Sequence, residues 1–197
     1  MRVLVIGASG LVGGAAAAAL RGGHEVIEAS RTGDHPVDIT DAASIARLFA
    51  DVGQVDAVIN AVGSVPWRRL DDLTPADYES AFRGKVLAQI DVARFAQSML
   101  ADGGSITLTT GILARAAVPT GAAAAMSNGA IESFVIAAAA ELTRGIRINA
   151  VSPTVLAEAT GYHDLFAGYP PVPAAAVGEA YRAVVEGDMT GTIVPVE

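Results

Sequence analysis

The start of the chain constrains the fold of this 197-residue protein more than any other stretch. Residues 3–20 carry no charge and lie between two arginines, a pattern that a signal peptide or a short membrane span also shows. The glycine-rich sequence GASGLVG at 7–13 interrupts this apolar run, whereas a membrane segment would be continuous. We therefore expect a buried strand at 2–6, a tight turn and an alanine-rich helix at about 11–21, in a cytoplasmic protein.

Apolar patterns typical of strands and of helices alternate along the rest of the chain. The predicted strands after the first are at 25–29, 56–60, 104–109, 146–151 and 191–196, and the predicted helices are at 42–51, about 75–100, 121–143 and 177–186. This alternation predicts the α/β class, with a Rossmann-like doubly wound parallel sheet in three α/β/α layers and residues 1–197 in a single domain. The segment 153–176, which contains the proline-rich sequence GYPPVP, is predicted to be a short, loose, lid-like segment.

The composition argues against several functional classes. The chain has 21 acidic and 13 basic side chains, a net charge of −8 and no basic run longer than Arg68-Arg69, so we expect no nucleic-acid partner. Because cysteine is absent and the three histidines are scattered, we expect no disulfide, no thiolate chemistry and no metal site. We expect no membrane partner either, which leaves a small molecule as the candidate ligand.

The glycine-rich loop follows the first predicted strand and opens the first predicted helix. Glycines there let backbone N–H groups approach a pyrophosphate at the helix N-terminus, where the helix dipole also favours negative charge. The second strand is followed by Ser30 and Arg31, at a place where an NAD-selective protein usually has an acid for the ribose hydroxyls. A guanidinium suits a 2′-phosphate instead, so we predict NADP(H) as the cofactor. The alternative is an ordinary strand-to-helix turn and a solvated arginine.

Several motifs resemble those of the short-chain dehydrogenase/reductases in order and approximate spacing. They are GASGLVG at 7–13, ASR at 29–31, VDIT at 37–40, NAVG at 60–63, GIRINAVSPTV at 145–155 and TG at 190–191. The resemblance implies that the adenine lies beside Asp38 and Ile39 and the nicotinamide carboxamide near Pro153 to Val155. The family often has glycine where Leu11 stands. The predicted cofactor-binding residues are Gly7, Ser9, Gly10, Leu11, Val12, Gly13, Ser30, Arg31, Asp38, Ile39, Asn60, Ala61, Val62, Gly63, Thr109, Pro153, Thr154 and Val155.

The resemblance also implies which residues would carry the chemistry. Members of the family transfer protons with a tyrosine, a lysine one helical turn later, a serine before them and an asparagine on the preceding long helix. When SNGAIESF is aligned with the family's Ser-Lys-Gly-Ala segment, the tyrosine, lysine and serine positions hold Ala124, Asn128 and Gly111. When YESAFRGKVLA is aligned with the family's long-helix motif, Lys85 stands at the asparagine position. No tyrosine lies in the predicted helix 121–143. The chain therefore resembles a small branch of the family that lacks the usual active-site residues.

Three side chains are candidates for a substitute proton donor. Lys85 is the only lysine in the chain; if partly buried, it would have a lowered pKa and could reach the crevice. Its alternative is a solvated or salt-bridged lysine. Tyr162 and His163 lie in the segment that closes over the substrate in the family, although packing or a subunit contact is the commoner explanation for such residues.

Other side chains near the expected crevice have two interpretations each. Thr109 and Thr110 could hydrogen-bond a carbonyl oxygen or could only end their strand, and Arg115 could hold an anionic substrate or be an exposed loop arginine. Three functions stay open: an NADP(H)-dependent oxidoreductase of a small carbonyl or alcohol, a non-catalytic protein that binds or senses NADP(H), and a scaffold without nucleotide. The resemblance also implies a homodimer or homotetramer formed through the two long helices.

Overall fold

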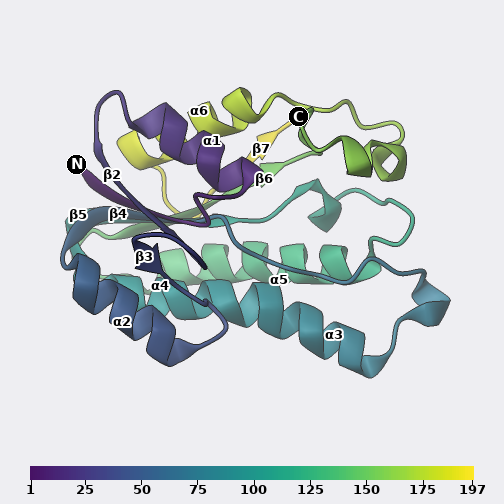
Figure 1. Ribbon diagram of the computed structural model, residues 1–197, viewed down its shortest axis with the longest axis horizontal. Coiled ribbons are helices and arrows are strands. Elements are labelled where there is room, and N and C mark those ends of the chain that lie inside the picture. Colours follow the sequence, from purple (N-terminus) through teal and green to yellow (C-terminus); the bar gives the residue numbers. More distant parts are fainter.

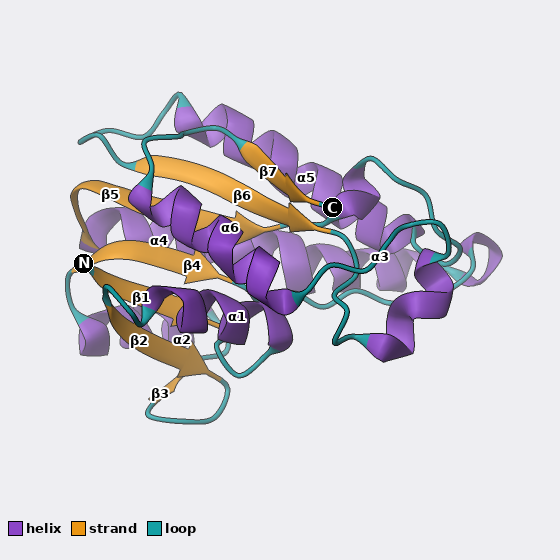
Figure 2. Cartoon of the chain, turned by 90° about the horizontal axis from the view of Figure 1, so that it is seen from above, coloured by secondary structure: helices purple, strands orange, loops and turns teal.

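The structure, a computed structural model, describes residues 1–197 and has a seven-stranded parallel sheet at its centre (Figure 2). Its strands are β1 Arg2–Ile6, β2 Glu25–Ser30, β3 His35–Pro36, β4 Val55–Asn60, β5 Leu100–Thr109, β6 Arg147–Pro153 and β7 Ile193–Val196. They lie in the order β3-β2-β1-β4-β5-β6-β7, and every neighbouring pair is parallel. The predicted α/β class and Rossmann-like doubly wound sheet are confirmed.

Helices cover both faces of this sheet (Figure 1). On one face lie α1 Leu11–Leu20 and α6 Ala174–Glu186, and on the other lie α2 Ala42–Val52, α3 Pro75–Ala81, α4 Ala88–Met99 and α5 Ala122–Ala139. Successive side chains of β1 point to opposite faces, as the period of a strand requires. Leu4 and Ile6 are therefore buried with residues of α2, α4 and α5, whereas Val3 and Val5 are buried with residues of α1 and α6.

The alanines of α1 allow that helix to lie close to α6. A Cβ atom at Gly178 of α6 would lie only 2.4 Å from the carbonyl oxygen of Ala15, so the contact leaves no room for a larger residue. Ala16 and Ala17 are fully buried on the sheet side of α1. Small residues thus fix the distance between the two helices and the position of the α1 N-terminus, which borders the site described below.

Local signals in the sequence explain where two helices of the other layer begin. The Asp41 carboxylate accepts a hydrogen bond of 2.9 Å from the backbone N–H of Ala43 and caps α2. Thr74 and Asp77 form a reciprocal capping box at α3. The predicted helix at 75–100 is continuous up to Met99, but its middle, Phe82–Leu87, is a π-helical segment, η2, that periodicity did not predict.

The structure corrects other boundaries. The short strand β3 was not predicted, α5 ends at Ala139 rather than at 143, and α6 begins at Ala174 rather than at 177 because the alanines after the helix N-cap Pro173 are already helical. The segment 153–176, predicted to be lid-like, has some regular structure. It contains a 3₁₀ helix, η4, at Thr160–Phe166, and a parallel bridge joins Leu156 to Val172.

One helix, α5, is long and apolar enough to cross a membrane if only length and composition are considered. In this fold it packs on the sheet, where Ile131 and Val135 are fully buried in the core. The same apolar composition therefore has an explanation within the protein.

Candidate active site

The crevice that could hold a ligand lies at the point where the strand order of the sheet reverses. The chain proceeds from β1 to β2 on one side and later to β4 on the other, so the loops after β1 and β4 diverge at the carboxyl ends of these strands. Two hollows open there and meet at Ala61, Val62 and Gly63. We call them the outer hollow, of about 500 Å³, and the inner cavity, of about 260 Å³.

The outer hollow borders the N-terminus of α1. Gly7 has φ of +91°, in the left-handed region that favours glycine, and a Cβ atom at Gly13 would lie 2.2 Å from the Gly7 carbonyl oxygen. Only glycine therefore permits this turn. The N-cap, Gly10, offers no side chain to the free N–H groups of the first helical turn. These groups and the helix dipole make the place suitable for an anion.

A second positive group lines the same hollow. Arg31 follows β2, is exposed, and forms no hydrogen bond or ion pair. The nearby Asp38 carboxylate accepts hydrogen bonds from the hydroxyl of Thr40 at 2.7 Å and from its backbone N–H at 2.9 Å. These bonds lower the pKa of Asp38, and the charge of Arg31 adds to the effect. Because Arg31 forms no hydrogen bond or ion pair, its guanidinium is free to bind an anionic group such as a phosphate.

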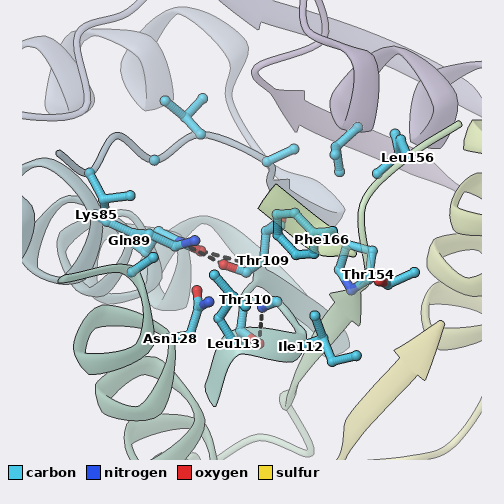
Figure 3. Close-up of a pocket in the computed structure, with 18 of the residues that line it drawn as sticks. Lys85, Gln89, Thr109, Thr110, Ile112, Leu113, Asn128, Thr154, Leu156 and Phe166 are labelled. Carbon is cyan, nitrogen blue, oxygen red and sulfur yellow. Dashed lines mark hydrogen bonds between the residues drawn. The ribbon is translucent and has the colours of Figure 1, made fainter. Parts of the chain in front are cut away.

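The inner cavity brings together the four positions at which the family resemblance implies catalytic groups. Lys85, Gly111, Ala124 and Asn128 come from three different parts of the chain, and all of them line this one cavity. Figure 3 shows Lys85 and Gln89 on one side of the cavity and Thr154, Leu156 and Phe166 on the other. Most of the wall is apolar.

Lys85 reaches the cavity from the π-helical segment. Its aliphatic chain lies against Gly63, where a Cβ atom would be only 2.8 Å from Lys85 Cγ. The ammonium group forms no hydrogen bond or ion pair, and burial lowers the pKa of Lys85 from 10.5 to about 8. Lys85 as a whole is half-buried, so it is neither fully exposed nor salt-bridged. A π-helical turn inside an α-helix is a frequent feature of functional sites.

Thr109 forms hydrogen bonds with two residues, Gln89 and Tyr181, that could not be identified from the sequence. The amide of Gln89 donates to the Thr109 carbonyl at 2.8 Å and accepts from its N–H at 2.9 Å (Figure 3). The Thr109 hydroxyl donates to the Asn60 carbonyl at 2.7 Å and shares a hydrogen bond of 2.5 Å with the hydroxyl of Tyr181, whose pKa is raised by burial. The Thr109 hydroxyl therefore helps to fix the end of β5, and its hydrogen bonds to Asn60 and Tyr181 leave it less available to a substrate. The sequence could not predict that Gln89 is buried, because a glutamine on an amphipathic helix is also typical of the exposed face.

Two polar atoms in the cavity wall lack partners. Asn128 Oδ1 and Thr154 Oγ1 are buried and form no hydrogen bond. The Asn128 side chain lies beside Gly111, where a Cβ atom would be 3.2 Å from Asn128 Nδ2. Buried polar atoms in proteins are normally paired, so these two atoms favour a polar ligand in the cavity.

The guanidinium of Arg115 is not free to bind an anionic substrate. Its guanidinium forms an ion pair with Glu132, at 2.5 Å, and donates to Ser152 Oγ at 2.9 Å. The hydroxyl of Thr110 donates to the same Glu132 at 2.8 Å. Both interpretations in which Arg115 or the Thr110 hydroxyl binds a substrate are therefore unsupported, because Glu132 already occupies these groups.

The other two candidate proton donors lie outside the inner cavity. The His163 ring makes a hydrogen bond of 3.1 Å with the Leu156 carbonyl oxygen, and Tyr162 is 46% exposed with its ring 5.7 Å from that of Trp67. Neither lines the cavity. Of the predicted cofactor residues, the structure places four outside both hollows: Leu11, Gly13, Asn60 and Val155. The others line one hollow or both.

Comparison with known proteins identifies the family. A model described as enoyl-(acyl carrier protein) reductase, built from short-chain dehydrogenase/reductases, matches residues 11–168. The chain belongs to the short-chain dehydrogenase/reductase family. The hydroxynaphthalene reductase-like protein Arp2 of Metarhizium brunneum is 31% identical over 162 residues, which are 75% of this chain and 61% of that protein. The chain thus spans about three-fifths of the length of such curated relatives.

Two solved structures are similar to this protein over its whole chain. The protein lin1944 of Listeria innocua is 43% identical, with a TM-score of 0.97 and complete coverage of both chains. A small-chain dehydrogenase in complex with NADPH is 29% identical, with a TM-score of 0.89, over 100% of this chain and 96% of the other. A related protein with this fold therefore binds NADPH.

Proposed function

We propose that this protein is an NADP(H)-dependent oxidoreductase that reduces a small carbonyl compound, or oxidises the corresponding alcohol, without the Tyr-Lys pair of its family. The observation that carries the proposal is the position of Lys85: the only lysine of the chain lies unpaired in the cavity that also contains Gly111, Ala124 and Asn128, the positions at which the resemblance implies catalytic groups. Family membership and the NADPH-bound relative support the cofactor.

The residues around the crevice fit a phosphorylated dinucleotide. The uncapped N-terminus of α1 suits the pyrophosphate, and the free guanidinium of Arg31 suits the 2′-phosphate. Asp38 and Ile39 lie in the same outer hollow, on the side where the adenosine part would bind. Thr154, with its unpaired hydroxyl, lines the inner cavity at the other end.

The chain's own contribution to the reaction would be proton transfer and exclusion of water. When bound, NADPH supplies a hydride to the carbonyl carbon. The ammonium group of Lys85 would give its proton to the carbonyl oxygen and become a neutral amine, which water then reprotonates. A pKa of about 8 suits such exchange near neutral pH. Ile112, Leu113 and Phe166 would shield the substrate from solvent.

A second candidate function is a protein that binds or senses NADP(H) without catalysis. Ala124 and Asn128 favour it, because neither side chain can exchange a proton near neutral pH and both stand at the positions that carry the chemistry in the family. The two functions share the cofactor site and differ only in turnover.

Turnover separates the two candidates. We expect NADPH oxidation with at least one member of a panel of aldehydes, ketones and quinones, a decrease of about a hundredfold or more in Lys85→Met, and a rate of reduction that falls as pH rises through about 8. His163→Ala and Tyr162→Phe test the remaining candidates. Since neither residue lines the cavity, we expect both variants to keep their activity. NADPH binding without turnover on any substrate would favour the sensor.

Cofactor selectivity tests the outer hollow separately. Arg31→Ala removes a charge-assisted contact with the 2′-phosphate, so the affinity for NADPH should fall by about tenfold to a hundredfold while that for NADH changes little. Isothermal titration calorimetry measures both affinities. Equal losses for the two cofactors would place the 2′-phosphate elsewhere.

A further inference from the structure

Lys85 is the only charged side chain that lines the inner cavity. No carboxylate lines the cavity with it: Glu132, which accepts a hydrogen bond from the wall residue Thr110, forms an ion pair with Arg115. The wall is otherwise made of apolar side chains and neutral polar groups, so little in the cavity screens the positive charge of the lysine.

The positions of the two hollows determine which end of a bound dinucleotide lies near the positive charge of Lys85. A dinucleotide with its 2′-phosphate at Arg31 and its pyrophosphate at the N-terminus of α1 fills the outer hollow, which continues into the inner cavity at Ala61–Gly63. Its other end, the nicotinamide, therefore enters the cavity that Lys85 lines. This step rests on the proposed function, and specifically on binding of NADP(H) in the crevice.

The two redox states of the cofactor differ by one positive charge at the nicotinamide ring. We propose that Lys85 makes this protein selective for the reduced cofactor, because its ammonium group repels the cationic ring of NADP⁺ and leaves the neutral ring of NADPH unaffected. At the effective dielectric constant of protein sites, two such charges within one small cavity change affinity by on the order of tenfold to a hundredfold. A tenfold preference corresponds to a shift of about 30 mV in the potential of the bound couple.

No other titratable group near the π-helical segment takes the place of Lys85 in this effect. Among the elements packed against it, Asp77 of α3 caps Thr74, Asp91 of α4 pairs with Arg94, and Glu132 of α5 pairs with Arg115. The exposed Glu79 and Arg83 line neither the inner cavity nor the outer hollow, but a third hollow that shares Ile39, Thr40 and Gly84 with the outer hollow. The preference should therefore follow the charge of Lys85 and should be lost as pH rises through about 8.

The preference has a consequence for either candidate function. In an oxidoreductase it favours release of NADP⁺ after carbonyl reduction. In a non-catalytic protein it makes occupancy of the site follow the reduced fraction of the NADP(H) pool, so that the protein would respond to redox state rather than to total cofactor.

Calorimetric titration of the full chain with NADPH and with NADP⁺ tests the inference. At pH 7 the wild type should bind NADPH more tightly, and Lys85→Met should reduce the ratio of the two affinities by about tenfold or more. Arg31→Ala is the matched control: it also removes one positive charge, but both cofactors carry the 2′-phosphate, so both affinities should fall with an unchanged ratio. Raising the pH to 9.5 should lower the ratio in the wild type and leave it constant in Lys85→Met.

The possible results separate this inference from the proposed function. A ratio that is the same in the wild type and in Lys85→Met, or that does not change with pH in the wild type, overturns the inference while cofactor binding stands. Failure of both cofactors to bind the wild type overturns the proposed function and the inference together. The pH series needs no substitution, so it decides the question even if Lys85→Met does not fold.

Discussion

The chemistry proposed for this site depends on a single residue, Lys85. Its carbon chain lies against Gly63, it lines a largely apolar cavity, and no carboxylate balances its charge. Burial of an unpaired charge costs free energy unless a ligand or a proton transfer compensates it. Ala124 and Asn128, at the positions where the resemblance implies a tyrosine and a lysine, line the same cavity, and Lys85 is its only charged lining residue.

Replacement of Lys85 should show the free-energy cost of burying its charge as a difference in stability that depends on pH. A folded-state pKa of about 8, against an ordinary value of 10.5, means that the unfolded chain binds more protons between these values, so the wild type gains stability as pH rises from about 8 to 10.5. We expect Lys85→Met to be more stable than the wild type by about 2–3 kcal/mol at pH 7 and by much less at pH 10.5. Urea denaturation at both pH values measures the difference. An equal difference at the two values would contradict the lowered pKa.

At the scale of elements, close helix packing places the glycine-rich turn. α1 lies close to α6 where Gly178 meets Ala15 and Ala19, and the α1 N-terminus borders the outer hollow. On the opposite face, the π-helical segment between α3 and α4 turns Lys85 towards the cavity. The two sides of the crevice are thus positioned from different layers of the fold.

The packing of α1 on α6 can be tested with one methyl group. In Gly178→Ala the new Cβ atom would lie 2.4 Å from the Ala15 carbonyl oxygen, so we expect a loss of about 2 kcal/mol or more in the free energy of unfolding, despite the better helix propensity of alanine. Gly22→Ala is the matched control, because its Cβ atom meets nothing within 4 Å. Chemical denaturation of the control should show unchanged or slightly raised stability; equal effects in both variants would contradict the close approach.

The elements differ in how far the sequence could predict them. Alternating apolar runs predicted every strand except β3, which has only two residues and no pattern. The aligned motif placed Lys85, Gly111, Ala124 and Asn128 at equivalent positions, and all four line one cavity. The π-helical segment could not be predicted, because helical periodicity does not show where one residue is added to a turn. Tyr181 gave no signal either, since its partner Thr109 is distant in sequence.

At the scale of the whole molecule, α3, α4 and α5 form a layer on one side of the sheet (Figure 1), and this layer has exposed apolar side chains. Met126 and Ile136 of α5 are 37% and 59% exposed, and Phe82 and Leu87 of the π-helical segment are exposed as well. Large exposed apolar side chains on neighbouring helices are typical of protein interfaces. These residues support the expectation of a homodimer or homotetramer.

The oligomeric state can be disrupted from this surface. A charge at position 136 would have to be desolvated in an interface between copies of α5, so Ile136→Glu should dissociate the assembly while the free chain stays folded. Analytical ultracentrifugation compares the masses, and circular dichroism checks the fold. A wild type that sediments as a monomer, or an assembly that Ile136→Glu leaves intact, would contradict an interface through α5.

The most direct test of a cofactor crevice with an altered active site is a crystal structure of the complex with NADPH. We predict the 2′-phosphate within hydrogen-bonding distance of the Arg31 guanidinium, the pyrophosphate at the N-terminus of α1, and the nicotinamide ring in the cavity lined by Lys85 and Thr154. A nicotinamide ring outside this cavity, or a tyrosine from elsewhere in the chain beside it, would contradict the proposal that Lys85 is the proton donor.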